Sequence, residues 1–150
     1  MKIAFAVLVF VPGLAIACGP GEKPVFSCTT TKQRQVEVCQ APTTVNYTFG
    51  KRGAKPEMSI KEPNASMRWI DGSGRMETHE ALTFHSGATR YRIAFDVYKY
   101  EGESVDATLE VLQGNKSVTT IQCKDKSIRY NSENLKANRQ NYGDDGTQEM

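Results

Sequence analysis

Apolar and polar side chains alternate in Arg90-Tyr91-Arg92-Ile93-Ala94-Phe95-Asp96-Val97, and this stretch decides the fold. Its odd-numbered positions are Tyr, Ile, Phe and Val, whereas its even-numbered positions are mostly polar. A period of two residues places successive side chains on opposite faces of a β-strand, so that one face is buried and the other meets water. The stretch therefore predicts a strand that contributes one face to a core.

Segments of the same kind surround this strand. Short runs rich in Val, Ile, Thr, Tyr and Phe fill residues 25–123 and are separated by clusters of Gly, Pro, Asn and Asp. Such spacing predicts an all-β fold, either a small antiparallel β-barrel or a sandwich of about eight or nine strands, and no helix. The expected strands are 25–30, 35–40, 45–49, 57–61, 66–70, 76–84, 90–98, 107–113 and 117–123.

A terminal hairpin is expected around Gly114-Asn115, a dipeptide typical of a two-residue turn. Apolar residues flank this turn on both sides, and the alternation recurs earlier in Gln35-Val36-Glu37-Val38. We expect the apolar members of both segments to join the core. Around the terminal turn they are Leu109, Val111, Val118 and Ile121.

The first 17 residues have the pattern of a secretory signal. Lys2 is followed by an apolar run that ends in Ala15-Ile16-Ala17, a small-residue cleavage site. The run is shorter than the ~20 residues that a membrane-spanning helix needs, and Pro12-Gly13 interrupts it. We therefore expect cleavage before Cys18 and export of the mature chain to a bacterial periplasm.

Composition divides the mature chain into three parts. Gly and Pro dominate residues 18–24, which we expect to be a linker or a lipid tether. The β-domain is expected over residues 25–125. Residues 126–150 are expected to be a mostly disordered tail, because their apolar groups are too few to offset the entropy of ordering the chain.

Four cysteines lie in the mature chain, at Cys18, Cys28, Cys39 and Cys123. Export places them in an oxidising compartment, where thiols close into disulfides. A bridge from Cys28 to Cys39 would span a hairpin across the turn at 32–35. A bridge from Cys28 to Cys123 would instead join the first strand to the last and close a long loop. The sequence leaves both pairings open.

Cys18 also has an interpretation as a lipid attachment site. The segment Leu14-Ala15-Ile16-Ala17-Cys18 is close to a lipoprotein signal, in which the first mature cysteine is acylated. The following Gly19-Pro20-Gly21 would then be a flexible tether to the envelope. In that case one disulfide would form and one thiol would be buried.

Charge and motifs argue against nucleic-acid binding and against catalysis. Without residues 1–17 the chain carries 18 basic and 17 acidic side chains, and this balance does not provide the cationic surface that nucleic acid requires. His79 and His85 have no further ligands at zinc-site spacing, and no G-x-S-x-G motif occurs. We expect no metal, no cofactor and no enzymatic activity.

Recognition of a protein partner by exposed loops is the remaining kind of function. The glycine-containing loops 71–75 and 85–89 are the richest candidates, because glycine lets a backbone approach a partner closely. Ser73 and Ser86 add hydroxyls that donate or accept hydrogen bonds. The only tryptophan, Trp69, is interpreted as a core anchor, with an exposed binding role as the alternative.

The layout resembles that of the bacterial periplasmic and membrane-bound inhibitors of c-type lysozyme. The resemblance covers about two-thirds of the mature chain and includes the cysteine that follows the signal. The other matching segments are Val25-Phe26-Ser27-Cys28, Ser86-Gly87-Ala88-Thr89-Arg90-Tyr91, Tyr98-Lys99-Tyr100-Glu101-Gly102, Ala107-Thr108 and Ile121-Gln122-Cys123.

The resemblance implies an inhibitor that inserts loops into the active-site cleft of a lysozyme-type peptidoglycan hydrolase. Ser86 and Lys99 would enter the cleft, because catalytic carboxyl groups accept hydrogen bonds from hydroxyl and ammonium donors, and Tyr91 would support the loop. An immunity or adaptor protein that binds a secreted toxin or another envelope partner is the alternative. The full set of expected partner-binding residues is Ser73, Ser86, Gly87, Arg90, Tyr91 and Lys99.

Overall fold

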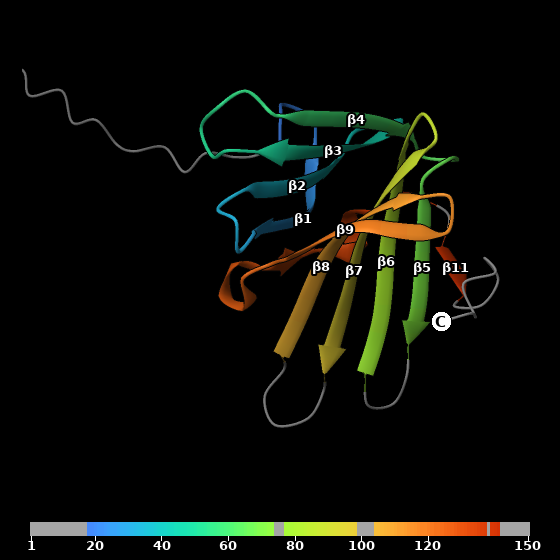
Figure 1. Cartoon of the computed structure of the whole chain (residues 1–150). Coiled ribbons are helices and arrows are strands. Elements are labelled where there is room, and N and C mark those ends of the chain that lie inside the picture. The colour runs from blue at the N-terminus through green and yellow to red at the C-terminus, as the bar shows by residue number, and fades with distance from the viewer. Residues whose placement is uncertain (1–17, 74–76, 99–103, 138, 142–150) are drawn as a thin grey trace, which may run out of the picture.

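The alternating stretch forms β7 (Thr89–Tyr98), a central strand of a six-stranded sheet in the computed structural model (Figure 1). The structure describes residues 18–73, 77–98, 104–137 and 139–141. We call the six-stranded sheet the second sheet, because the chain reaches it after the five-stranded one. Its strands follow the order β11-β5-β6-β7-β8-β9. Their bounds are Arg139–Asn141 for β11, Arg68–Ser73 for β5, Glu77–Ser86 for β6, Ser104–Gln113 for β8 and Lys116–Gln122 for β9.

The first sheet has five strands in the order β10-β1-β2-β3-β4. Their bounds are Arg129–Tyr130 for β10, Lys23–Thr29 for β1, Gln35–Gln40 for β2, Thr44–Gly50 for β3 and Met58–Pro63 for β4. The pairs within both sheets are antiparallel except β11 with β5, which is parallel. The all-β expectation is confirmed, as a sandwich.

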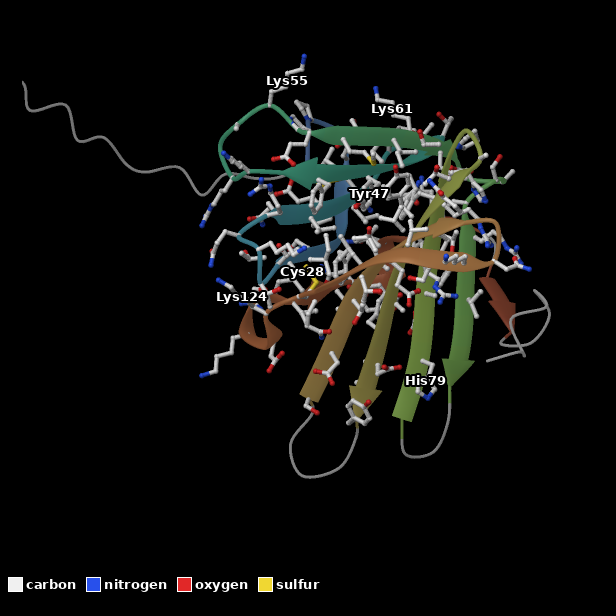
Figure 2. The ribbon with its side chains drawn as sticks, in the orientation of Figure 1. Cys28, Tyr47, Lys55, Lys61, His79 and Lys124 are labelled. Carbon is white, nitrogen blue, oxygen red and sulfur yellow. A yellow bond between two sulfur atoms is a disulfide. The ribbon has the colours of Figure 1, made fainter. Side chains whose placement is uncertain are left out.

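The core lies between the two sheets. Phe26 of β1 stacks on Phe95 of β7 with ring centroids 5.8 Å apart, and Tyr47 of β3 packs against Phe84 of β6 at 5.3 Å. Each large apolar side chain that leaves water here stabilises the fold by ~1.5–3 kcal/mol. Figure 2 shows Tyr47 between the sheets, whereas Lys55 and Lys61 extend away from them.

Residues 125–137 and 139–141 form ordered structure that the sequence did not predict. Two short 3-10 helices, η1 (Asp125–Ser127) and η2 (Ser132–Asn134), alternate with β10 and β11. Ile128, Leu135 and Ala137 are buried members of the core. The expected tail boundary at 125 is therefore wrong for the described part of 126–141, because these few apolar groups pack against a preformed sandwich. Residues 142–150 lie outside the described residues.

The segment expected to be a linker is also part of the fold. Glu22 holds it in place, because its carboxylate accepts the backbone N–H of Gly19 at 2.9 Å and the side-chain amide of Asn46 at 2.5 Å. Cys18 is buried and forms a disulfide with Cys39 of β2. Residues 18–24 are therefore attached to the first sheet at several points rather than forming a free tether.

The structure pairs Cys18 with Cys39 and Cys28 with Cys123. The Cys28–Cys39 alternative is wrong because the register of β1 and β2 places Cys28 opposite Val36 and Cys39 opposite Pro24. The structure does not support the expected acylation of Cys18, because its Sγ forms a disulfide with Cys39. The two disulfides suggest an oxidising, extracytoplasmic environment.

One expected core residue is on the surface. Val118 is 45% exposed, because it is an extra residue in β9 where the β8–β9 register shifts between Val111 and Leu112. The other three apolar residues around this turn, Leu109, Val111 and Ile121, are in or packed against the core or only partly exposed. Within the described residues, no helix is long and apolar enough to cross a membrane.

Candidate functional site

Two hairpin turns lie side by side at one end of the second sheet. The β6–β7 turn contains Gly87 with φ +60°, a value that the first central position of a type II′ turn requires. The β8–β9 turn contains Gly114 with φ +59°. Arg90 links the two turns by donating a hydrogen bond from Nη2 to the carbonyl oxygen of Gly114 at 2.5 Å.

The register places one residue from each of four strands in a single row beside these turns. Ser86 pairs with Thr89, Thr89 with Gln113, and Gln113 with Lys116. Paired residues project from the same face, and neighbouring strands are about 4.8 Å apart, so Ser86 and Lys116 are separated by about 14 Å. Both residues are exposed. We name residues 86–89 and 114–118 the double-turn surface.

Packing beneath the double-turn surface is extensive. Tyr91 of β7 lies 6.1 Å from Tyr47 of the opposite sheet, measured between ring centroids. The buried carboxylate of Glu62 on β4 accepts the backbone N–H of His85 at 2.9 Å, and its other oxygen lies 3.2 Å from His85 Nδ1. Because these contacts join the two sheets directly behind the β6–β7 turn, the turn projects from a rigid base.

The structure divides the predicted partner-binding residues between two ends of the molecule. Ser86, Gly87, Arg90 and Tyr91 are together at the double-turn surface, with Arg90 and Tyr91 as supports. Ser73 ends β5 at the opposite end. Lys99 lies outside the described residues, and its neighbour Tyr98 ends β7, about 30 Å of extended strand away from Thr89.

Lys116 is the lysine that the register brings to the row of Ser86, and the sequence analysis did not select it. The position of Lys116 in this row follows from the pairing of β6 with β7, β7 with β8 and β8 with β9. A motif within one short segment does not reveal that strand order. The available signal was the pair of glycine turns at Gly87 and Gly114, separated by one strand pair of matching length. Val118, exposed beside Lys116, adds an apolar contact to the same surface.

His79 and His85 both lie on β6, but each contacts a different acidic side chain. His79 contacts the carboxylate of Asp96 across the strand pair, and His85 contacts Glu62. A pocket of about 210 Å³ is lined by residues that include His79, Ala81, Ala94 and Asp96. Figure 2 shows His79 near the end of the sheet opposite to the double-turn surface.

Trp69 lies in the core as expected and belongs to a partly buried network of hydrogen bonds with Glu80 and Tyr130. Its indole Nε1 donates to Glu80 Oε2 at 2.9 Å, and the phenol of Tyr130 donates to the same oxygen. Burial, followed by the hydrogen bond to the Glu80 carboxylate and its charge, raises the pKa of Tyr130 above its usual range. The network fastens β10 to the second sheet.

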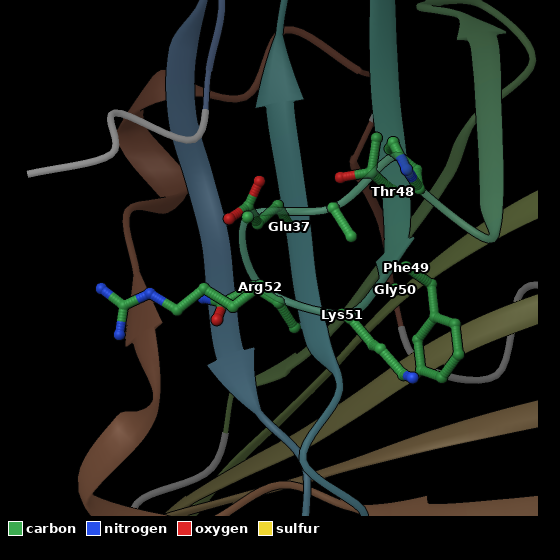
Figure 3. A pocket seen from close by; sticks show the side chains of 10 residues that line it. Glu37, Thr48, Phe49, Gly50, Lys51 and Arg52 are labelled. Carbon is green, nitrogen blue, oxygen red and sulfur yellow. The ribbon is translucent and has the colours of Figure 1, made fainter.

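A pocket of about 190 Å³ lies on the outer face of the first sheet, below the loop that joins β3 to β4 (Figure 3). Gln35 and Glu37 of β2 and Thr48 of β3 line it from the sheet, and Lys51 and Arg52 line it from the loop. Burial raises the pKa of the Glu37 carboxyl above its usual range, and the charge of Arg52 opposes this shift. We name this site the roofed pocket.

One group of potential metal ligands occurs in the described part of the chain, formed by Cys18, Glu22 and Cys39. Its two sulfur atoms are joined in a disulfide and so provide no thiolate. The single remaining carboxylate already accepts two hydrogen bonds. This group therefore stabilises the N-terminal segment and is not a candidate metal centre.

Comparison with protein-family models, with curated proteins and with solved structures finds no match to this chain. The resemblance to lysozyme inhibitors therefore stays a prediction, supported by motifs and not by a detected relative.

Proposed function

We propose that this protein is an exported binding protein that uses the double-turn surface to block a lysozyme-type peptidoglycan hydrolase. The observation that carries the proposal is the row that places the Ser86 hydroxyl and the Lys116 ammonium at one end of a disulfide-linked sandwich. A hydrolase cleft with catalytic carboxyl groups accepts hydrogen bonds from both donors. In this proposal Lys116 takes the role that the resemblance assigned to Lys99.

The rigidity of the surface supports binding. A loop that is already ordered before binding loses little conformational entropy when it enters a cleft. The Arg90–Gly114 hydrogen bond and the Glu62–His85 contacts hold both turns in the free protein. Exposed Val118 can leave water on binding, which favours association by the hydrophobic effect.

The test is inhibition of cell-wall lysis by a panel of lysozymes, measured with the purified exported protein. We expect the double variant Ser86→Ala/Lys116→Ala to weaken inhibition by at least about tenfold, or about 1.4 kcal/mol of binding free energy. Ser59→Ala/Lys61→Ala is the matched control, because both residues are exposed on β4 of the other sheet. This control should inhibit like the unaltered protein.

Three results would contradict the proposal in different ways. Absence of inhibition by the unaltered protein across the panel would remove the function and leave the immunity or adaptor alternative. Inhibition that the Ser86→Ala/Lys116→Ala variant retains in full would remove the site. A loss on Lys99→Ala with none on Lys116→Ala would return the lysine role to the original expectation.

A further inference from the structure

We propose that the roofed pocket binds a small zwitterion, a molecule that carries an ammonium group beside an anionic oxygen group. This inference is separate from the proposed function, because the pocket lies on the first sheet and the double-turn surface belongs to the second. It rests on the shape of the pocket, on its uncommitted polar side chains and on the position of its charges.

The loop that covers the pocket, residues 51–57, is held in place by contacts at both of its ends. A Cβ on Gly50 would lie 2.9 Å from the backbone nitrogen of Glu57, so only glycine allows the loop to fold back this closely. The Glu57 N–H donates to the carbonyl oxygen of Phe49 at 2.9 Å, and the Glu57 carboxylate forms an ion pair with Arg34 at 2.8 Å. The cavity below the loop therefore exists before a ligand arrives.

The floor of the pocket offers polar groups without committed partners. Gln35, Glu37 and Thr48 are half-buried. Within the described ranges of the chain, no hydrogen bond or ion pair reaches these three side chains. A carboxylate that is partly removed from water and not paired gains more from a cationic ligand than a solvated one does. Glu37 therefore selects for an ammonium group.

The charges at the rim exclude a simple cation. Lys51 and Arg52 are exposed on the loop, and Figure 3 shows their side chains extending in opposite directions, with Glu37 drawn above them. Two positive charges around one negative charge repel a ligand that is only cationic. An anionic group on the same ligand removes that repulsion and can pair with Lys51 or Arg52. A free amino acid and a phosphoethanolamine head group both satisfy this requirement.

The test is a titration of the full exported chain followed by the backbone amide NMR signals of Glu37, Thr48 and Gly53. The probes are glycine, L-alanine and phosphoethanolamine, with acetate and methylammonium as single-charge controls. We expect saturable shifts at these amides with at least one zwitterion and much weaker binding of both controls. Comparison of the amino acids with phosphoethanolamine identifies which source of the shared chemistry fits better.

Two variants locate the binding. Glu37→Gln keeps the shape of the side chain and should weaken zwitterion binding by at least about tenfold. Glu133→Gln, the same change on the exposed side chain of η2, should leave it unaltered. Absence of saturable shifts with all three zwitterions would overturn the proposal, as would equal binding of either single-charge control or full binding by Glu37→Gln. Because this readout does not involve a hydrolase, its failure leaves the proposed function standing.

Discussion

At the scale of single residues, two carboxylates illustrate how surroundings decide the role of a side chain. Glu80 is half-buried but accepts hydrogen bonds from Trp69 and Tyr130, so it joins a structural network. Glu37 is half-buried without such donors among the described residues, and burial raises its pKa. A satisfied acid stabilises the fold, whereas an unsatisfied one facing a cavity is available to a ligand.

The raised pKa of Glu37 predicts a pH dependence of stability. The folded state binds this proton more tightly than the unfolded state, so the stability associated with Glu37 is present at acidic pH and is lost as the pH rises through the raised pKa. Glu37→Gln removes the charge that burial penalises. We expect this variant to be as stable as the unaltered protein or more stable at neutral pH, with a smaller change across mildly acidic pH.

Urea denaturation of both proteins over a series of pH values measures this effect. Glu133→Gln provides the control for loss of an exposed carboxylate. A Glu37→Gln variant that is clearly less stable at neutral pH would show that the carboxylate is satisfied in the folded protein.

At the scale of elements, the alternation of apolar and polar side chains predicts the strands, but it does not predict the disulfides that link them. β2 was predicted at its observed bounds of Gln35–Gln40, and the other eight expected strands overlap β1 and β3 to β9 with ends that differ by a few residues. β10 and β11 were missed because two or three residues are too short for a periodic pattern. The disulfides depend on which strands become neighbours, and this is a non-local property.

The two disulfides should contribute unequally to stability. The Cys28–Cys123 bridge spans 95 residues and the Cys18–Cys39 bridge spans 21. Loop-closure entropy then predicts a loss of about 5 kcal/mol for Cys28→Ala/Cys123→Ala and about 3 kcal/mol for Cys18→Ala/Cys39→Ala. Chemical denaturation of the two double variants measures the difference.

Thiol counting accompanies that experiment. The unaltered protein should show no thiol that reacts under denaturing conditions before reduction, because both pairs are closed. A reactive Cys39 together with a lipid mass on Cys18 would contradict the observed pairing and restore the acylation expectation.

At the scale of the whole molecule, the segment after Cys123 completes the sandwich. Tyr130 packs against Phe95 with ring centroids 4.3 Å apart, and Asn131 N–H donates to the carbonyl oxygen of Val25 at 2.7 Å. Ile128 and Leu135 are buried in the same core as the strands of both sheets. The segment after Cys123 therefore closes one side of the sandwich, although its sequence shows no regular alternation of apolar and polar residues.

Removal of this segment tests its contribution. A chain that ends at Lys124 loses several buried apolar groups at ~1.5–3 kcal/mol each, and a whole domain is stable by only ~5–15 kcal/mol. We expect it to be largely unfolded, as measured by circular dichroism and amide exchange. The milder variant Leu135→Ala should lower stability by ~2 kcal/mol or more, while Lys126→Ala, exposed in the same segment, should not. A truncated chain with unaltered stability would refute this role.

The sequence by itself determined the all-β architecture, the positions of nine strands and the glycine turns, because alternation and turn chemistry act between residues that are close along the chain. Only the tertiary structure decided the pairing of Cys18 with Cys39, the separation of Ser86 from the end of β7 that precedes Lys99, and the place of Ser86 and Lys116 in one row across four strands. These features depend on strand order and on contacts between distant segments. Their physical cause is the burial of one common core, to which every element contributes at once.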